Sequence, residues 1–92
     1  MKKRSQGNKK TAARIQELKV ATGVCIKKLR IDCELMQEQV AEIMGWSEAV
    51  QSEIEKGRRS VTVPELIALA EGMRENPDVL LRNIREWKRR PR

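Results

Sequence analysis

The chain has 92 residues, of which 36% are charged and 39% hydrophobic, and its formal net charge is +7. This length suits one domain with a modest core, and the composition excludes both a largely disordered chain and a membrane-spanning protein. The sequence contains no histidine and no tyrosine. It also has no glycine-rich phosphate loop and no serine–histidine–aspartate set, so we predict that the protein is not an enzyme and uses no cofactor.

The positive charge lies at the two ends of the sequence. Residues 1–14 carry six Lys or Arg and no acid, and residues 82–92 carry six against Glu86 alone. The middle, residues 15–81, holds eight basic against twelve acidic residues and is mildly acidic. Basic ends can neutralise phosphates without sequence preference, although they can also simply keep a chain solvated.

Residues 1–10 are polar, which predicts a flexible basic arm. A helical pattern begins at Thr11, with apolar or small residues spaced by three and four as far as Cys33. Gly23 lies inside this pattern. It occupies either a continuous helix, at a cost of about 1 kcal/mol relative to alanine, or a break between two helices.

The two cysteines, Cys25 and Cys33, do not predict a disulfide or a metal site. Eight residues along one helix separate them by roughly 12 Å, which is too far for a mutual disulfide. Two cysteines without any histidine make a poor metal site, so we predict no metal. We interpret both as small apolar residues on a buried helix face, with an intermolecular disulfide or a reactive thiol as the alternatives.

Two short helices joined at Gly45 are expected next, over about 37–44 and 48–56, in the outline of a helix-turn-helix. Met36 cannot cap the first of them through an oxygen, and Gln39 is expected to reach back in partial compensation. Ser47 is expected to cap the second. Gly45 is expected to adopt the left-handed conformation that the turn requires.

The second of these helices has an apolar and a polar face at 100° per residue. Val50, Gln51 and Ile54 are expected to face inward together with Ser47. The outward face is centred on three residues and flanked by two glutamates, and comprises Ala49, Ser52, Lys56, Glu48 and Glu53.

Two further helices are expected. Thr62 and Glu65 have the spacing of a capping box, and Asn76-Pro77 begins the last helix. In that helix, an apolar stripe continues as Leu80, Ile84 and Trp87. This stripe favours a homodimer, and the alternative is that Trp87 packs on the first helix of its own chain.

The ordered set of residues from about 24 to 81 resembles the phage repressor and Cro family of helix-turn-helix proteins, also called XRE-type. The resemblance implies an all-α, compact five-helix repressor-like domain over residues 11–88, with the helix-turn-helix at 37–56, an arm at 1–10 and a basic tail at 89–92. The matching residues are Ile26, Leu29, Arg30, Leu35, Gln37, Val40, Ala41, Gly45, Ser47, Ile54, Glu55, Gly57, Leu66, Leu69, Ala70 and Leu80.

The resemblance also implies structural roles for three residues. Arg30 and Glu55 match positions that often form a largely buried ion pair between the first and third helices. Removing one partner of such a pair costs about 3–5 kcal/mol, because a buried charge is left unpaired. Trp46 matches an apolar turn position, which implies a core residue rather than a ring that stacks on bases.

The resemblance also implies DNA contacts, which are carried over from the family to the matching positions of this sequence. Gln37 matches a phosphate-contacting glutamine, five residues of the third helix match groove-facing positions, and the loop after that helix usually meets the DNA backbone. Two departures stand out. Two glutamates flank the groove face, where one acid can accept a hydrogen bond from cytosine N4 but two would be repelled by phosphates, and Gln51 stands at a usually apolar position. The predicted DNA-binding residues are Gln37, Ser47, Glu48, Ala49, Ser52, Glu53, Lys56, Arg58 and Arg59.

The sequence thus predicts a cytoplasmic, dimeric, sequence-specific DNA-binding transcriptional regulator, a repressor whose arginines and lysines contact phosphates of double-stranded DNA. The main alternative is a protein-interaction module on the same fold, such as an antitoxin or adaptor, whose acidic third helix would bind a protein partner. A third possibility is nonspecific nucleic-acid binding by the basic ends alone.

Overall fold

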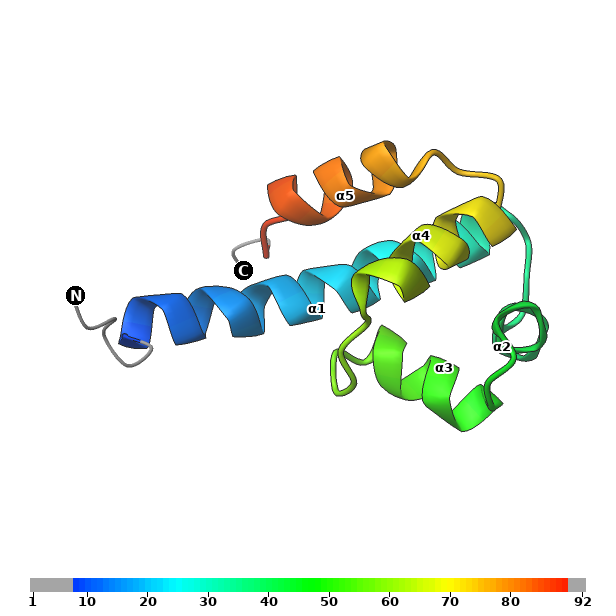
Figure 1. The fold of residues 1–92 in the computed structure, drawn as a ribbon, viewed down its shortest axis with the longest axis horizontal. Coiled ribbons are helices and arrows are strands. Elements are labelled where there is room, and N and C mark those ends of the chain that lie inside the picture. The colour runs from blue at the N-terminus through cyan, green and yellow to red at the C-terminus, as the bar shows by residue number, and fades with distance from the viewer. Residues whose placement is uncertain (1–7, 90–92) are drawn as a thin grey trace.

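The computed structural model describes residues 8–89, which form five helices and, within that range, no strand. The predicted all-α class is confirmed. Figure 1 shows a long first helix with α5 beside it, α4 in front of its second half, and α2 and α3 on the side away from α5. The helices are α1 (Lys9–Asp32), α2 (Gln37–Met44), α3 (Glu48–Glu55), α4 (Val63–Gly72) and α5 (Pro77–Glu86).

Helix α1 begins two residues earlier than expected, because Asn8 caps it. The Asn8 side-chain oxygen accepts a hydrogen bond from the Thr11 backbone N–H at 2.8 Å, which satisfies a free donor of the first turn. Of the arm predicted over residues 1–10, residues 1–7 lie outside the described range, and Lys9 and Lys10 belong to this helix. Of the predicted tail, residues 90–92 also lie outside it.

Helix α1 runs without a break through Gly23, which decides between the two expectations for that glycine. A Cβ at this position would lie 2.8 Å from the Glu55 carbonyl oxygen and closer still to that of Ile54. Helices α1 and α3 therefore touch backbone to backbone at Gly23, which only a residue without a side chain permits. Gly23 marks a helix crossing rather than a helix end.

The core lies where the second half of α1 meets the other four helices. Ile26 and Ile54 are 0% and 1% exposed and stand at its centre. Leu80 and Ile84 of α5 are also buried in it, and Trp87 packs half-buried against it. The apolar stripe of the last helix is thus used inside the monomer, which favours the alternative to the dimer that this stripe had suggested. The buried cluster consists of Ala21, Ile26, Val40, Ile54, Leu66, Leu69, Ala70, Met73, Leu80 and Ile84.

Local capping signals were predicted well. The Met36 backbone N–H donates to Gln39 Oε1 at 2.8 Å, as expected for a cap that lacks its own oxygen. Gly45 ends α2 in the left-handed conformation with φ 75°. Thr62 and Glu65 form the reciprocal capping box of α4, with hydrogen bonds of 3.0 and 3.2 Å.

One of the two cysteines differs from the expectation. Cys25 agrees with it, since this residue is half-buried against the core, where burial raises the pKa of its thiol; the difference lies at Cys33. Cys33 is instead exposed, because it is the residue that caps the end of α1. Both are free thiols.

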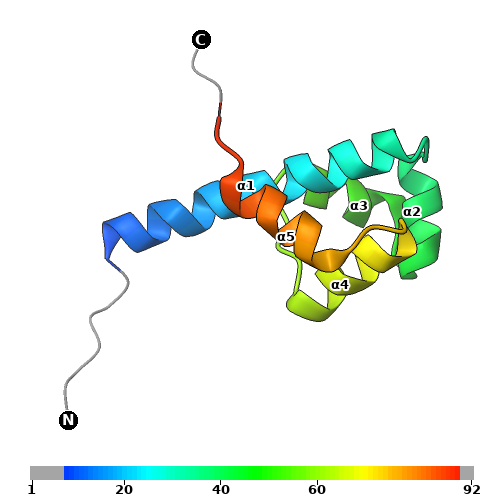
Figure 2. The ribbon, with the colours of Figure 1, turned by 90° about the horizontal axis from the view of Figure 1, so that it is seen from above.

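The first half of α1 has few contacts with the rest of the fold, among them the hydrogen bond that Arg14 Nη2 donates to the Arg85 carbonyl of α5 at 3.4 Å. Every residue from Lys9 to Glu17 is exposed, and Figures 1 and 2 show this stretch projecting beyond the body formed by α2–α5. Within residues 8–89, no helix combines the length and the apolarity needed to cross a membrane.

Candidate nucleic-acid interface

The turn between α2 and α3 fixes where α3 begins. The Trp46 backbone N–H donates to the Ala41 carbonyl at 3.1 Å, which closes the end of α2. The Ser47 hydroxyl then accepts from the Val50 backbone N–H at 3.1 Å and caps α3, as predicted. Because Ile54 of α3 is fully buried, the opposite side of this short helix must face outward.

The predicted Arg30–Glu55 ion pair ties α3 to α1. Arg30 Nε donates to Glu55 Oε2 at 2.7 Å and Arg30 Nη2 donates to Oε1 at 2.9 Å, a two-pronged arrangement. The remaining guanidinium nitrogen, Nη1, donates to the Leu35 carbonyl at 2.8 Å. The side chains of Arg30 and Glu55 are 11% and 2% exposed, so the pair is buried.

Glu55 also receives hydrogen bonds from two glutamines. Gln37 Nε2 donates to Oε1 at 3.0 Å and Gln51 Nε2 donates to Oε2 at 2.9 Å. Gln51 Oε1 in turn accepts from the Trp46 indole N–H at 3.0 Å. Gln51 is 0% exposed, so its polar side chain occupies the usually apolar position by joining the turn residue Trp46 to the ion pair. The helix pattern placed Gln51 inward, but the partner that satisfies it was not foreseen.

These contacts hold Glu55 in its charged form. Burial by itself would raise the pKa of the Glu55 carboxyl, yet the hydrogen bonds from Arg30, Gln51 and Gln37 outweigh it and leave the pKa below its ordinary value. The same pairing raises the pKa of Arg30. No buried side-chain nitrogen or oxygen in the described part of the chain lacks a hydrogen-bond partner, so the network is complete.

All nine predicted DNA-binding residues are at least partly accessible. Gln37, Ser52, Glu53 and Arg59 are half-buried. Gln37 differs from the others because one of its amide hydrogens already binds Glu55. The fully exposed members are Ser47, Glu48, Ala49, Lys56 and Arg58.

The loop after α3 folds back onto the end of that helix. The backbone N–H groups of Arg58 and Arg59 both donate to the Glu53 carbonyl, at 2.9 and 3.2 Å. Gly57 adopts φ 76°, which turns the chain at this point. The loop thus presents its side chains from a fixed backbone beside α3.

The two loop arginines are not equivalent. Arg58 is exposed, with Nη1 3.5 Å from Glu53 Oε2 and its side chain 67% accessible. The guanidinium of Arg59 instead lies 5.2 Å from the centroid of the Trp46 ring, and its Nη2 lies 3.6 Å from Glu65 Oε2. The resemblance implied that both arginines bind DNA. The geometry leaves Arg58 available and gives Arg59 intramolecular partners.

The charge of this surface is balanced rather than acidic. Lys56, Arg58 and Arg59 lie beside three acids, Glu48, Glu53 and Glu65, so the formal charges cancel. A phosphate approaching the end of α3 therefore meets the cations Lys56 and Arg58 as well as the glutamates. The acidity that the third helix shows in the sequence is offset by the loop that follows it.

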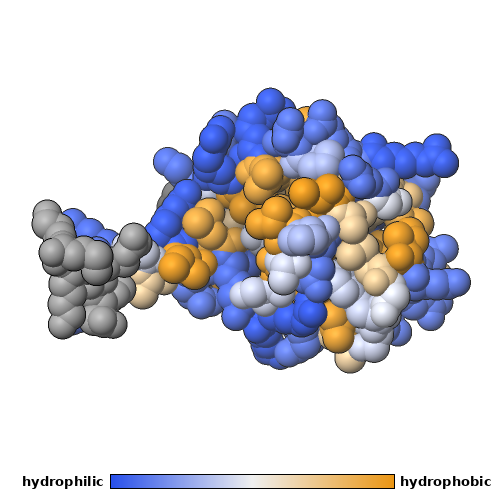
Figure 3. Space-filling model, viewed as in Figure 1, coloured by the Kyte–Doolittle hydropathy of each residue, from blue (hydrophilic) through white to orange (hydrophobic). Residues whose placement is uncertain are grey.

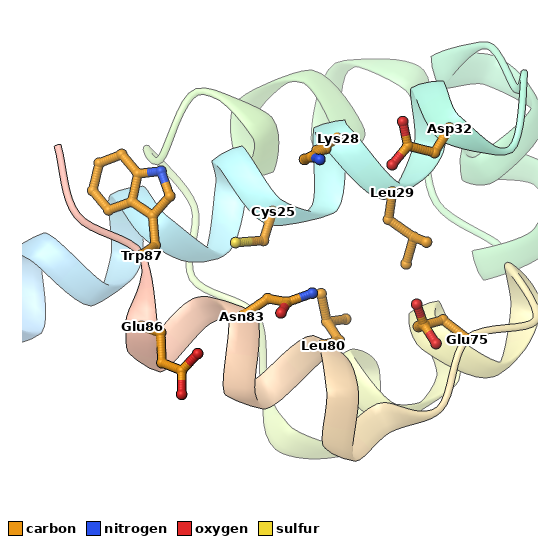
Figure 4. Close-up of a pocket in the computed structure, with 9 residues that line it drawn as sticks. All are labelled: Cys25, Lys28, Leu29, Asp32, Glu75, Leu80, Asn83, Glu86 and Trp87. Atoms are coloured by element: carbon orange, nitrogen blue, oxygen red, sulfur yellow. The ribbon is translucent and has the colours of Figure 1, made fainter. Parts of the chain in front are cut away.

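A separate hollow of about 340 Å³ lies between α1 and α5, at the other side of the core. Figure 4 shows Cys25 and Leu29 reaching from α1, Leu80 and Asn83 from α5, and Trp87 at one end, with charged side chains around them. Among the described residues, no three His, Cys, Asp or Glu side chains come together in a way that could hold a metal ion.

A family model described as a helix-turn-helix domain matches residues 21–84. Two structures of the clp gene regulator ClgR from Corynebacterium glutamicum are similar to the chain at 24% identity, with TM-scores of 0.70 and 0.71. Both cover 74% of this chain, and they are themselves covered over 87% and 72% of their lengths.

The restriction-modification controller protein C.AhdI from Aeromonas hydrophila is also similar, with a TM-score of 0.64 and 27% identity. The match covers 67% of this chain and 90% of that protein. No curated protein matches the sequence significantly.

Proposed function

Because the chain belongs to the family of helix-turn-helix domains, we propose that it is a sequence-specific transcriptional repressor that places the outward face of α3 in the major groove. Proteins of this family are DNA-binding regulators and not enzymes, so the predictions of DNA binding and of no enzymatic activity are confirmed at that level. Repression, groove contacts and the residues that make them are our proposal.

The observation that carries the proposal is the way α3 is held. Its inner side is fixed by the buried network of Arg30, Glu55 and Gln51, while Glu48, Ala49 and Lys56 outside that network are exposed. A recognition element must be positioned before it meets its target, because ordering it on binding would cost affinity. This helix is rigid where it is hidden and unobstructed where DNA would lie.

Different residues would read bases and bind phosphates. Ala49 and Ser52 are small enough for the helix to approach base edges, and Glu48 or Glu53 can accept a hydrogen bond from cytosine N4. Lys56 and Arg58 would contact phosphates from the end of the helix. One amide hydrogen of Gln37 remains for a phosphate oxygen, since the other is directed to Glu55. Arg59 would act mainly by fixing the loop.

A regulatory role agrees with the similarity to C.AhdI, which is a restriction-modification controller protein. We propose that this chain likewise acts on double-stranded DNA in the cytoplasm, as a homodimer on a site with two-fold symmetry. The alternative of a protein-binding module, which rested on the acidity of the third helix, is less favoured because Lys56, Arg58 and Arg59 offset Glu48 and Glu53.

Selection of binding sites from a random pool of duplex DNA by the full chain tests this proposal. We expect one enriched sequence, composed of two symmetric halves. A Ser52→Arg variant should enrich a different sequence, because it changes the groove-facing surface of α3 without touching the core. Equal binding of all duplexes by both proteins, with affinity lost when residues 1–7 and 90–92 are removed, would instead assign binding to the basic ends.

A further inference from the structure

Helix α4 is apolar on both of its sides. Leu66 and Leu69 face the core and are 8% and 1% exposed. On the outward side, Val63 is 69% exposed and Ile67 is 38% exposed, and Ala68 beside them is also exposed. The outer side of a surface helix is normally polar, and a helix that is apolar all round is normally covered. The outward side of α4 thus has the composition of an interface.

The exposed apolar surface continues beyond α4. At its far end, Gly72 lies against Ile43 of α2, since a Cβ on Gly72 would come 2.8 Å from Ile43 Cγ2. Ile43 is itself 51% exposed. Figure 3 shows hydrophobic atoms spread over this side of the molecule, the side on which α4 lies toward the viewer. Contiguous patches of this kind mark sites of interaction rather than ordinary surface.

The first half of α1 is a second largely uncovered element, although Arg14 Nη2 donates to the Arg85 carbonyl of α5 at 3.4 Å. Ile15 is 60% exposed there, although so short a helical stretch is only marginally stable in water on its own. Residues 9–19 carry four basic side chains against Glu17. In contrast, α4 carries two acids, Glu65 and Glu71, and no base. The two uncovered helical surfaces are therefore both apolar and opposite in charge.

We propose that a second copy of the chain covers both surfaces, with the first half of α1 of each copy lying on the outward side of α4 of the other. A two-fold axis makes this contact twice, so each apolar surface is buried and each charge imbalance is met by its opposite. The proposal rests on the homodimer of the proposed function and names its interface. Helix α3 lies on a different side of the body (Figure 1) and stays free for DNA.

Sedimentation equilibrium of the full chain without DNA tests this interface, with Ile15→Glu and Ile67→Lys as the two probes. Each places a charge in an apolar contact and weakens the charge complementarity, and each is felt twice in a two-fold dimer. We expect the dissociation constant of the dimer to rise by about tenfold or more for either variant. The double variant should dimerise more tightly than either single variant, because its new charges are again opposite.

Two exposed apolar residues outside this surface provide matched controls. Ile31 is 53% exposed on the other half of α1 and Leu81 is 49% exposed on α5. Ile31→Glu and Leu81→Lys should leave the dissociation constant unchanged. A circular dichroism spectrum equal to that of the unmodified chain would show that the four single variants and the double variant fold.

Three results would overturn the interface. The unmodified chain could be monomeric at about 100 µM, a concentration well above the dissociation constants of specific dimers. The Ile15→Glu variant could dimerise normally, which would indicate that α4 packs on α4, or the double variant could dimerise more weakly than both single variants. Binding of each variant to a duplex carrying one half-site separates this proposal from the proposed function. Monomeric variants should still bind that half-site through α3. If the unmodified chain bound no DNA at all, that result would contradict the proposed DNA-binding function.

Discussion

The two sides of α3 contain similar polar residues that are held in opposite ways. On the inner side, Glu55 receives hydrogen bonds from three side chains and is 2% exposed. On the outer side, Glu53 is 44% exposed and lies 3.5 Å from Arg58 in an open pair. A charge on the inner side determines whether the helix stays in place. A charge on the outer side is free to change what the helix binds, at almost no cost in stability.

The largest effect is expected from breaking the inner side. Glu55→Ala leaves the Arg30 guanidinium buried without its partner, which should lower the free energy of unfolding by about 3–5 kcal/mol. Glu17→Ala removes the partner of Arg14 in an exposed pair and should cost only about 0–1 kcal/mol. Urea unfolding of both variants measures the difference. Equal losses would contradict the assignment of Glu55 to a buried, fully bonded site.

Gly23→Ala should give the next largest loss. Alanine gains about 1 kcal/mol in helix propensity, but its Cβ would meet the backbone carbonyls of Ile54 and Glu55. Because backbone cannot move aside as a flexible side chain can, we expect a net destabilisation of about 1–3 kcal/mol in thermal or urea unfolding. Lys28→Ala, at an exposed position of the same helix, should be neutral, and a stabilised Gly23→Ala variant would disprove the close crossing.

The inner side should also show in the pH dependence of stability. The folded-state pKa of Glu55 lies below its ordinary value, so its contribution is complete above the unfolded pKa of about 4.3 and is lost as pH falls through the folded pKa. The stability difference between the unmodified chain and Glu55→Gln should therefore be constant from about pH 5 to 7 and shrink in stronger acid. A difference that grows toward low pH would contradict this sign.

The outer side should respond in binding and not in stability. Arg58→Gln should reduce the steepness of log affinity against log salt by about one, the value for one lost phosphate contact. Its unfolding curve should stay within about 0.5 kcal/mol of the original. Arg82→Gln removes another exposed arginine, from α5, and serves as the control. Identical salt dependence for both variants would exclude Arg58 from the interface.

The smallest effect is expected at Glu53. Glu53→Gln removes a negative charge and releases Arg58 from its exposed pair, which should tighten DNA binding by about two- to fivefold. Fluorescence anisotropy with the selected duplex measures it. If Glu53 instead accepts from cytosine N4, the variant loses preference for that base. Unchanged affinity and unchanged preference would remove Glu53 from the DNA surface.

Features determined by neighbours in sequence could be predicted, while features determined by distant contacts could not. The turn at Gly45, the cap at Ser47 and the capping box of Thr62 with Glu65 each depend on residues within a few positions. The continuity of α1 through Gly23 depends on α3, about thirty residues further along the chain. No local pattern could have indicated that crossing.

The same limit applies to the candidate site. The helix period placed Gln51 inward, but only the fold brings the Trp46 indole and the Glu55 carboxylate to its amide. The outward set was read correctly as accessible, whereas the contacts of Arg59 with Trp46 and Glu65 join three separate segments. Composition assigned charge to the ends and the centre of the sequence, yet the charge that DNA would meet is set by how the loop folds onto α3.

Amide chemical-shift mapping of the isotope-labelled full chain, titrated with the selected duplex and with an unrelated one, tests most directly whether the outward side of α3 is the DNA-binding surface. The selected duplex should perturb the amides of residues 47–53 and 56–59 at stoichiometric DNA, and the unrelated duplex should perturb them far less. Perturbations confined to α4, α5 or the ends of the chain, with those of α3 unchanged, would contradict the account.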